Sequence, residues 1–227
     1  MIKIDSLSKS FGNNVVLKNI NLSFKPGEIN GIVGENGAGK TTLFRCIAGL
    51  ESFDGNIEYS NGIIKNVTGF LETNPPFLSK ITGLEYLQLL CNARKIKIED
   101  PKSKNLFELP LDRYAESYST GMKKKLALTA ILLQKNNIFI LDEPFNGVDI
   151  HSNILIHELL NKLKSLGKTI VLSSHIFSTM SENCDYIHLL ENGKITKSAS
   201  KDGFHEIEKQ MVKTGIGHKI DLLDLGN

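Results

Sequence analysis

The sequence predicts an α/β fold with a mainly parallel core sheet, and three observations support this prediction. Short apolar runs typical of strands alternate with segments whose apolar residues have helical spacing. A glycine-rich loop joins one such strand, GEINGIVG, directly to a helix. A second apolar run, NIFILDEP, stops at two acids and a proline, which is typical of a buried strand that ends at the edge of a parallel sheet.

The first half of the chain is expected to begin with antiparallel strands. Residues 1–24 contain apolar residues that partly alternate, and Pro26-Gly27 then makes a turn. The strand GEINGIVG and the helix after the glycine-rich loop follow, and residues 51–75 contain short strands rich in turns. Helical spacing returns in GLEYLQLLCNARK, so we expect a short helical insert over about residues 74–118.

The second half is expected to continue the alternation. A helix through KKKLALTAILLQK precedes the strand NIFIL. Asp149 opens the next helix and Gly167 ends it, before the apolar strand TIVLSSH. YIHLLENGKITKSA predicts a hairpin with Asn192-Gly193 as its turn. Residues 199–227 are only weakly patterned, so a single domain over residues 1–227 ends in a tail without an assignment.

Composition excludes several classes of protein. A chain of 227 residues with 41% hydrophobic content is long and apolar enough to exclude intrinsic disorder. Lys and Arg (27) nearly balance Asp and Glu (25), and only three of the basic residues are Arg, so we expect no nucleic-acid partner. Three cysteines without a CxxC pair indicate a reducing compartment. No apolar run approaches the roughly 20 residues of a membrane span.

The glycine-rich loop carries the clearest chemical signal. GENGAGKT fits the pattern GxxxxGK[ST] and lies between a predicted strand and a predicted helix. Its backbone N–H groups and the helix N-terminus suit an anion, Lys40 suits the β and γ phosphates, and the Thr41 hydroxyl suits Mg²⁺. The residues expected to contact the nucleotide here are Gly34, Glu35, Asn36, Gly37, Ala38, Gly39, Lys40, Thr41 and Thr42.

Two carboxylates follow the apolar strand at the edge where open α/β sheets bind ligands. Asp142 is expected to hold Mg²⁺, together with Thr41. Glu143 is expected to orient or deprotonate the attacking water. The alternative, two surface acids that merely end a strand, is disfavoured by the phosphate-binding loop upstream. The two motifs together indicate a P-loop nucleotide hydrolase. The pattern NKxD, which recognises guanine in some of these proteins, is absent from the sequence.

A third motif, Tyr118-Ser119-Thr120-Gly121-Met122-Lys123, opens the helix before the carboxylate strand. By itself a Ser-Gly helix start is usually an ordinary N-cap. In this order of motifs, however, the chain resembles the ATP-binding cassette (ABC) family, whose signature is LSGGQ or a close variant. The resemblance extends in register through about residues 1–200.

The resemblance implies further site residues. Phe11 lies where the family has an aromatic ring that stacks on adenine, and Val16 where it has an apolar neighbour, although a lone Phe near a strand is usually core. Asp149 ends the family's D-loop, and His175 takes the place of its switch histidine, although a lone His there is more often structural. In the family, two cassettes bind two ATP molecules head to tail.

That arrangement implies that Ser119 and Gly121 complete the ATP site of a second cassette and that Asp149 communicates between the two sites. The sequence also departs from the family pattern. Thr73 stands where a Gln is usual, with Glu72 as an alternative Mg²⁺ or water partner, and Met122-Lys123 replaces the usual signature end. The run of lysines at 123–125 fits a solvated helix face better than an anion-binding patch.

The resemblance therefore implies an ATP-binding subunit that hydrolyses MgATP in a cassette dimer. It would drive export by a separate multi-span membrane permease, from a cytoplasmic position on the inner face of the cell membrane. One alternative is a soluble ABC ATPase that remodels ribosomes or nucleic acid, which near-neutral charge disfavours. Another is a non-hydrolysing cassette that acts as a regulator: Lys40, Asp142, Glu143 and His175 disfavour it, whereas Thr73 leaves it open.

Overall fold

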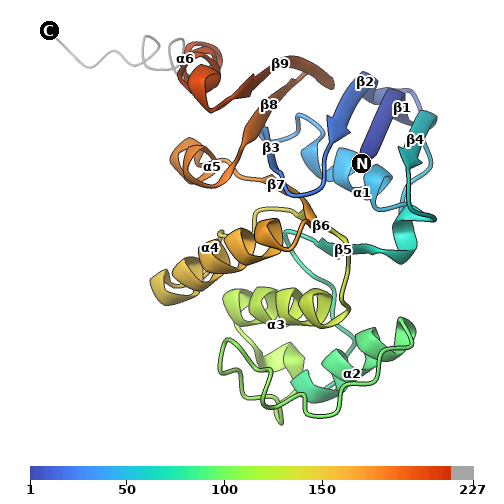
Figure 1. The fold of residues 1–227 in the computed structure, drawn as a ribbon, viewed down its shortest axis with the longest axis vertical. Coiled ribbons are helices and arrows are strands. Elements are labelled where there is room, and N and C mark those ends of the chain that lie inside the picture. Colours follow the sequence, from blue (N-terminus) through green and yellow to red (C-terminus); the bar gives the residue numbers. More distant parts are fainter. Residues whose placement is uncertain (216–227) are drawn as a thin grey trace, which may run out of the picture.

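The computed structural model describes residues 1–215, so the last part of the unassigned tail lies outside the described residues. The chain forms two sheets that lie side by side (Figure 1). The smaller sheet is antiparallel and has the order β2-β1-β4. It consists of β1 (Ile2–Phe11), β2 (Asn14–Phe24) and β4 (Asp54–Tyr59). The expected antiparallel opening of the chain is thus confirmed.

The larger sheet is the core of the molecule and has the order β5-β6-β7-β3-β8-β9. Its first five strands are parallel, and β9 pairs antiparallel with β8. The strands β3, β6 and β7 are buried along their whole length, as their continuous apolar runs predict. The bounds of the strands are β3 (Ile29–Val33), β5 (Thr68–Leu71), β6 (Ile138–Leu141), β7 (Thr169–Ser173), β8 (Tyr186–Glu191) and β9 (Lys194–Ser200).

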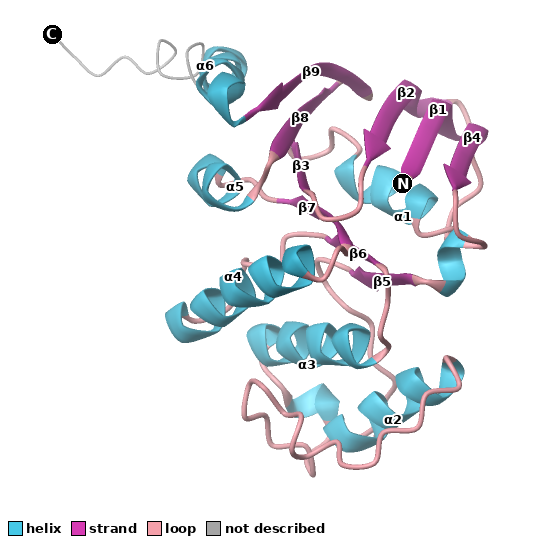
Figure 2. Cartoon of the chain, viewed as in Figure 1, coloured by secondary structure: helices cyan, strands magenta, loops and turns pink. Residues whose placement is uncertain are grey.

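Helices cover both faces of the core sheet (Figure 2). Side chains on one face, such as Ile32 and Val171, pack with α1 and the antiparallel sheet. Side chains on the other face, such as Phe139 and Leu172, pack with α3, α4 and α5. The helices are α1 (Lys40–Ile47), α2 (Gly83–Ala93), α3 (Thr120–Leu133), α4 (Ile150–Ser165), α5 (Phe177–Asn183) and α6 (Phe204–Gly215).

The structure adds detail where the sequence patterns are weak. Within residues 74–118, α2 and a 3₁₀ turn at Ala115–Ser117 are the helical elements, and much of the stretch between them winds through turns. The short α5 between His175 and β8 was not expected. The unassigned tail begins with the end of β9 and continues into α6. The spacing of Phe204 and Ile207, both buried on α6, is helical and was overlooked in the sequence.

Local capping explains several helix starts. Thr82 and Glu85 form a reciprocal capping box at the start of α2. The side chains of Ser119 and Asp149 accept hydrogen bonds from backbone N–H groups at the starts of α3 and α4. In the part of the chain that the structure describes, none of these helices is both long and apolar enough to cross a bilayer.

Candidate functional site

The glycine-rich loop connects β3 to α1, as its sequence predicts. Two of its glycines leave no room for a side chain: a Cβ atom at Gly34 would lie 2.2 Å from the carbonyl oxygen of Leu190, and one at Gly39 would lie 2.9 Å from Leu17. Gly39 also has a φ of 108°, a conformation that favours glycine. The loop is thereby held between β8 and β2, with α1 beginning directly after it.

Lys40 lies inside the curl of this loop. Its side chain is buried, and Nζ donates hydrogen bonds to the carbonyl oxygens of Gly34 (2.7 Å) and Glu35 (3.1 Å). Burial lowers the pKa of the Lys40 ammonium, and the nearby carboxylates of Asp142 and Glu143 oppose this effect. The loop therefore holds a cation at the start of a helix whose N-terminus is itself electropositive.

Two adjoining hollows open around the loop. The hollow beside the sheet edge has a volume of about 370 Å³ and brings together residues from the loop and from the segments that directly follow β6 and β7. It is lined by Val16, Asn36, Gly37, Gly39, Lys40, Thr41, Thr42, Thr73, Asp142, Glu143, Asn146 and His175. Residues far apart in the sequence thus meet in one place, as expected for the carboxyl edge of a parallel sheet.

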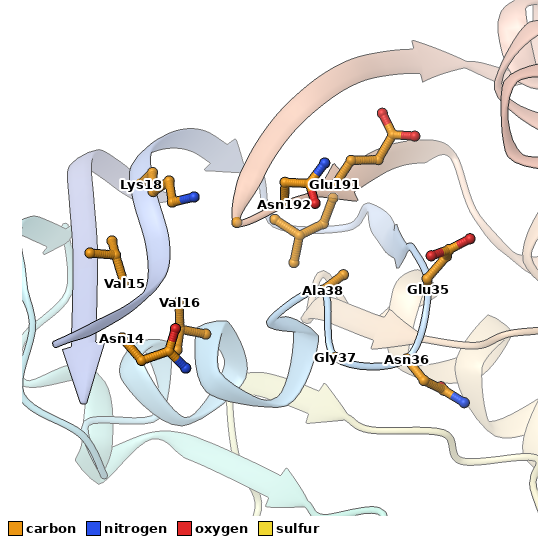
Figure 3. A pocket seen from close by; sticks show the side chains of 12 residues that line it. Asn14, Val15, Val16, Lys18, Glu35, Asn36, Gly37, Ala38, Glu191 and Asn192 are labelled. Atoms are coloured by element: carbon orange, nitrogen blue, oxygen red, sulfur yellow. The ribbon is translucent and has the colours of Figure 1, made fainter. Parts of the chain in front are cut away.

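The second hollow has a volume of about 540 Å³ and lies between β2, the loop and the β8–β9 turn (Figure 3). Val16 lines both hollows, and Glu35 and Ala38 line only this one. The turn residue Gly193 approaches β2 so closely that Gly193 O accepts a hydrogen bond from Lys18 N at 2.8 Å. This contact closes one side of the hollow.

Asp142 is at the centre of a network of hydroxyl groups. Its Oδ2 accepts hydrogen bonds from Oγ1 of Thr41 (2.6 Å) and Oγ1 of Thr73 (2.8 Å), and its Oδ1 accepts one from Oγ of Ser173 (2.5 Å). The carboxylate is 1% exposed. One carboxylate surrounded by hydroxyl oxygens fits Mg²⁺, which prefers hard oxygen ligands and retains several waters. Thr41 and Asp142 would hold the ion.

Glu143 points toward the end of β7. Its Oε2 lies 2.9 Å from Nδ1 of His175, and its backbone N–H donates to Oγ of Ser173 at 3.0 Å. Glu143 has a φ of 54°, a conformation that is costly for a side chain of this size and that concentrates at functional sites. The pair places a proton acceptor and an imidazole in the same hollow.

The signature motif lies elsewhere on the chain. Ser119 caps α3, with its Oγ accepting from Met122 N at 3.2 Å, and a Cβ at Gly121 would lie 2.4 Å from the carbonyl oxygen of Gly147. The signature therefore packs tightly against the loop before α4. Of the described residues, neither Ser119 nor Gly121 lines the two hollows of their own chain.

Asp149 lies at the junction of that loop and α4. Its carboxylate accepts hydrogen bonds from Ser152 N (2.9 Å) and Ser152 Oγ (2.8 Å) and pairs with Lys125 Nζ at 3.0 Å. These bonds, with that from the Ser152 N–H the largest contribution, hold the pKa of Asp149 well below its usual range. The carboxylate is fixed in its charged form beside the signature helix.

Phe11 ends β1 and is half exposed, with Lys9 Nζ 4.6 Å from the centre of its ring. Among the described residues that line the two hollows, Phe11 is absent and Val16 is present. At the loop that usually carries Gln, Thr73 bonds Asp142, whereas Glu72 turns away to form an ion pair with Arg45 at 3.1 Å. Thr73 is thus the residue of this loop that reaches the site.

Sequence reasoning overlooked Asn146, which lines the smaller hollow, and also Ser173 and Lys124, which bond Asp142 and Glu143 from outside it. Ser173 carries no motif signal, and only its position at the end of a buried strand could have drawn attention to it. Lys124 was assigned with its neighbours to a solvated face, and this was wrong, because its side chain is 2% exposed. A signal existed, since Lys124 lies four and seven residues before the buried Leu128 and Ile131 and so shares their helix face.

Taken together, the loop, the paired acids and the fold define a P-loop nucleoside triphosphatase. A family model described as "ABC transporter" matches residues 17–146. The chain therefore belongs to the ABC transporter family, as an ATP-binding subunit and an ATPase.

Relatives and solved structures agree with this family. The chain is 30% identical over 220 residues to a lantibiotic transport ATP-binding protein of Streptococcus pyogenes, covering 92% of this chain and 95% of the relative. It is 31% identical over 230 residues to a bacitracin transport ATP-binding protein of Enterococcus faecalis, covering 95% and 74%. The solved structure of an ATP-binding subunit of an ABC transporter superposes with a TM-score of 0.80 at 25% identity, covering 95% of each chain.

A dimeric ATP-binding cassette in a post-hydrolysis state with ADP and Pi has the same fold, with a TM-score of 0.79 at 22% identity, covering 88% of this chain and 99% of the cassette. The predicted α/β fold of a P-loop nucleotide hydrolase, with its parallel core sheet and antiparallel N-terminal sheet, is thereby confirmed.

Proposed function

We propose that this subunit binds MgATP in the two adjoining hollows and hydrolyses it with Glu143 as the proton acceptor. The observation that carries the proposal is the convergence of Lys40, Asp142, Glu143 and His175 on one hollow. These side chains come from the P-loop, the end of β6 and the end of β7, so only the folded sheet brings them together.

The phosphates would lie along the P-loop. Its backbone N–H groups and Lys40 would bind the β and γ phosphates. Bound Mg²⁺, held by Thr41 and Asp142, would neutralise charge on the phosphate oxygens. The base and ribose would occupy the larger hollow beside Val16, and Phe11, half exposed at the end of β1, would stack on adenine.

Hydrolysis would follow from the position of Glu143. A water oxygen forms the new bond to the γ-phosphorus while the bond to the β–γ bridging oxygen breaks, and Glu143 accepts the proton of that water. His175, 2.9 Å from Glu143, would orient the carboxylate and hydrogen-bond the γ-phosphate. Loss of the γ-phosphate removes these contacts.

A second cassette would complete the site. Ser119 and Gly121 do not line the hollows of their own chain, which supports their action on the ATP of a partner cassette in a head-to-tail dimer. Asp149, fixed beside the signature helix by Lys125 and Ser152, would lie between the two sites. Hydrolysis would then separate the cassettes, because ATP binding favours the closed dimer.

The work of the dimer would be export through a separate multi-span permease, with the chain on the cytoplasmic face of the membrane. The relatives named for lantibiotic and bacitracin transport support this choice. The segment around α2 would contact the permease.

An ATPase assay tests the catalytic assignment. Glu143→Gln should lower kcat by about 10²- to 10⁴-fold, because the amide cannot accept the proton of water, while ATP binding is retained. Glu158→Gln is the matched control, because Glu158 is exposed on α4. The kcat of this variant should equal that of the wild type. Equal kcat in Glu143→Gln and the wild type would refute the role of Glu143.

A further inference from the structure

Lys124 is a buried cation that the mechanism above does not use. It lies on the second turn of α3, the helix whose N-cap is the signature residue Ser119. Its side chain is 2% exposed, and burial lowers its pKa, with the carboxylates of Glu143 and Asp142 opposing the effect. A lysine buried to this extent needs strong compensating contacts, because an ammonium group removed from water is unfavourable unless its hydrogen-bond donors are satisfied.

The contacts of Lys124 identify what it holds. Nζ donates one hydrogen bond to the carbonyl oxygen of Glu143 (2.8 Å) and another to the carbonyl oxygen of Asn146 (2.8 Å). The two acceptors are the ends of a four-residue turn that follows β6. Glu143 N is held separately by Ser173, so the backbone of Glu143 is fixed on both sides.

The backbone of Glu143 needs such support. Its φ of 54° is costly for a residue that is not glycine, and the surrounding structure must maintain it. A charge-assisted hydrogen bond to the Glu143 carbonyl fixes this peptide, and therefore the direction of the carboxylate toward His175. The bond to Asn146 fixes the start of the loop that carries Gly147 against Gly121.

We propose that Lys124 is a positioning residue that connects the signature helix to the catalytic turn, by holding the carbonyl groups of Glu143 and Asn146 together. Movement of α3, whose first residues would contact the partner's ATP, then moves the turn that carries Glu143. This inference rests on the role proposed for Glu143 and assigns Lys124 no contact with ATP, water or Mg²⁺.

The test compares steady-state ATPase kinetics of the full chain carrying Lys124→Met, Lys124→Gln or Lys162→Met. Methionine has a similar length and no donor, so kcat should fall by about 10- to 100-fold, as expected when a catalytic group is misplaced. KM for ATP should stay within about 3-fold, because Lys40 and the P-loop are unchanged. Glutamine supplies N–H donors on a side chain one bond shorter than that of lysine, so Lys124→Gln should keep a higher kcat than Lys124→Met. Lys162 is exposed near the end of α4, and its variant should behave as the wild type.

The proposal is overturned if Lys124→Met keeps the wild-type kcat, if KM rises in step with the loss of kcat, or if glutamine is no better than methionine. If the methionine variant does not fold, Lys124→Gln decides: amide hydrogens of residues 143–149 should exchange faster than in the wild type, and unchanged exchange overturns the proposal. A wild-type kcat in Glu143→Gln would instead refute the proposed function, so the two failures are separate results.

Discussion

At the residue scale, the carboxylate of Asp142 shows how the site is assembled from single hydroxyl groups. Three hydroxyls donate to it, from Thr41 in α1, Thr73 in the loop after β5 and Ser173 at the end of β7. In a site buried to this degree, hydrogen bonds to a charged group are worth about 1.5–3 kcal/mol each. The arrangement keeps both oxygens of Asp142 in a defined direction toward the hollow.

Thr73 provides a test of this arrangement. Thr73→Val keeps the shape of the side chain and removes the donor, so the free energy of unfolding should fall by about 1.5–3 kcal/mol. Urea denaturation at neutral pH measures this change. Thr73→Ser keeps the hydroxyl and should lose less. A valine variant as stable as the wild type would mean that the 2.8 Å bond to Asp142 contributes nothing to folding.

His188 predicts a pH dependence of stability. It is 7% exposed, bonds Ser198 Oγ at 2.8 Å, and burial lowers its pKa to about 4. The unfolded chain, with a pKa of about 6.5, binds a proton that the folded chain does not, so protonation favours unfolding. The free energy of unfolding should fall between about pH 6.5 and pH 4, by up to about 3 kcal/mol.

Chemical denaturation at several pH values checks this prediction. His188→Gln removes the titrating group, so its unfolding free energy should depend less on pH across the same range. The same slope in both proteins would assign the dependence to other groups.

At the element scale, the β8–β9 hairpin is the clearest case in which a turn shapes a binding surface. Asn192 and Gly193 have φ values of 49° and 78°, as the two-residue turn predicted from Asn-Gly requires. The turn lies against β2, where a Cβ at Gly193 would be 2.2 Å from the carbonyl oxygen of Val16. The hairpin thus forms a wall of the larger hollow (Figure 3).

Gly193→Ala should therefore destabilise the protein by more than backbone strain alone. Gly167 is the matched control, because its φ is 70° and nothing lies within 4 Å of a Cβ there. Gly167→Ala should cost about 1 kcal/mol. Gly193→Ala should cost about 1–3 kcal/mol more, since β2 must move. Equal unfolding free energies for the two variants would show that the contact with Val16 relaxes freely.

At the scale of the whole molecule, the proposed function implies that one chain holds two halves of an ATP site that do not meet within it. The hollows lie around the P-loop, and the signature residues Ser119 and Gly121 line neither of them among the residues described. Two chains packed head to tail would bring the halves together twice. ATP would then act as part of the interface, which couples its hydrolysis to separation of the chains.

Light scattering tests this arrangement. Glu143→Gln should form a dimer when ATP is added, because the nucleotide is bound and not consumed. The double variant with Lys40→Ala should stay monomeric, since Lys40 is the cation that the P-loop encloses. A monomer for Glu143→Gln at saturating ATP would indicate that a different cassette or the permease is required for pairing.

A pull-down from gently solubilised membranes tests the larger assembly. The proposed function predicts that a multi-span protein remains bound to the tagged chain in a fixed ratio after a detergent wash. Mass spectrometry of the bound material identifies it. Ribosomal proteins or nucleic acid in its place would favour the soluble remodelling ATPase.

The sequence by itself determined the local parts of this protein. Short patterns predict these parts, because each depends only on neighbouring residues. They are the P-loop, the strand end at Asp142-Glu143, the helix caps at Ser119 and Asp149, and the Asn-Gly hairpin. The parallel core sheet followed from buried apolar runs alternating with helices, and the β-rich opening from the partial alternation before Gly27. These features need no knowledge of distant contacts.

Only the tertiary structure decided which residues meet. Ser173 bonds Asp142, and Thr73 reaches the same carboxylate where Glu72 does not. Lys124, which the sequence places on a solvated face, is a buried hydrogen-bond donor. The helix α5 was missed because seven residues are too few for a clear periodicity, whereas α6 was missed although Phe204, Ile207 and Met211 have helical spacing. The physical reason is that tertiary packing decides which side chains are buried and which groups they bond. The sequence around Lys124 resembles that of an exposed helix face, and only the fold places the carbonyl groups of Glu143 and Asn146 beside its ammonium group.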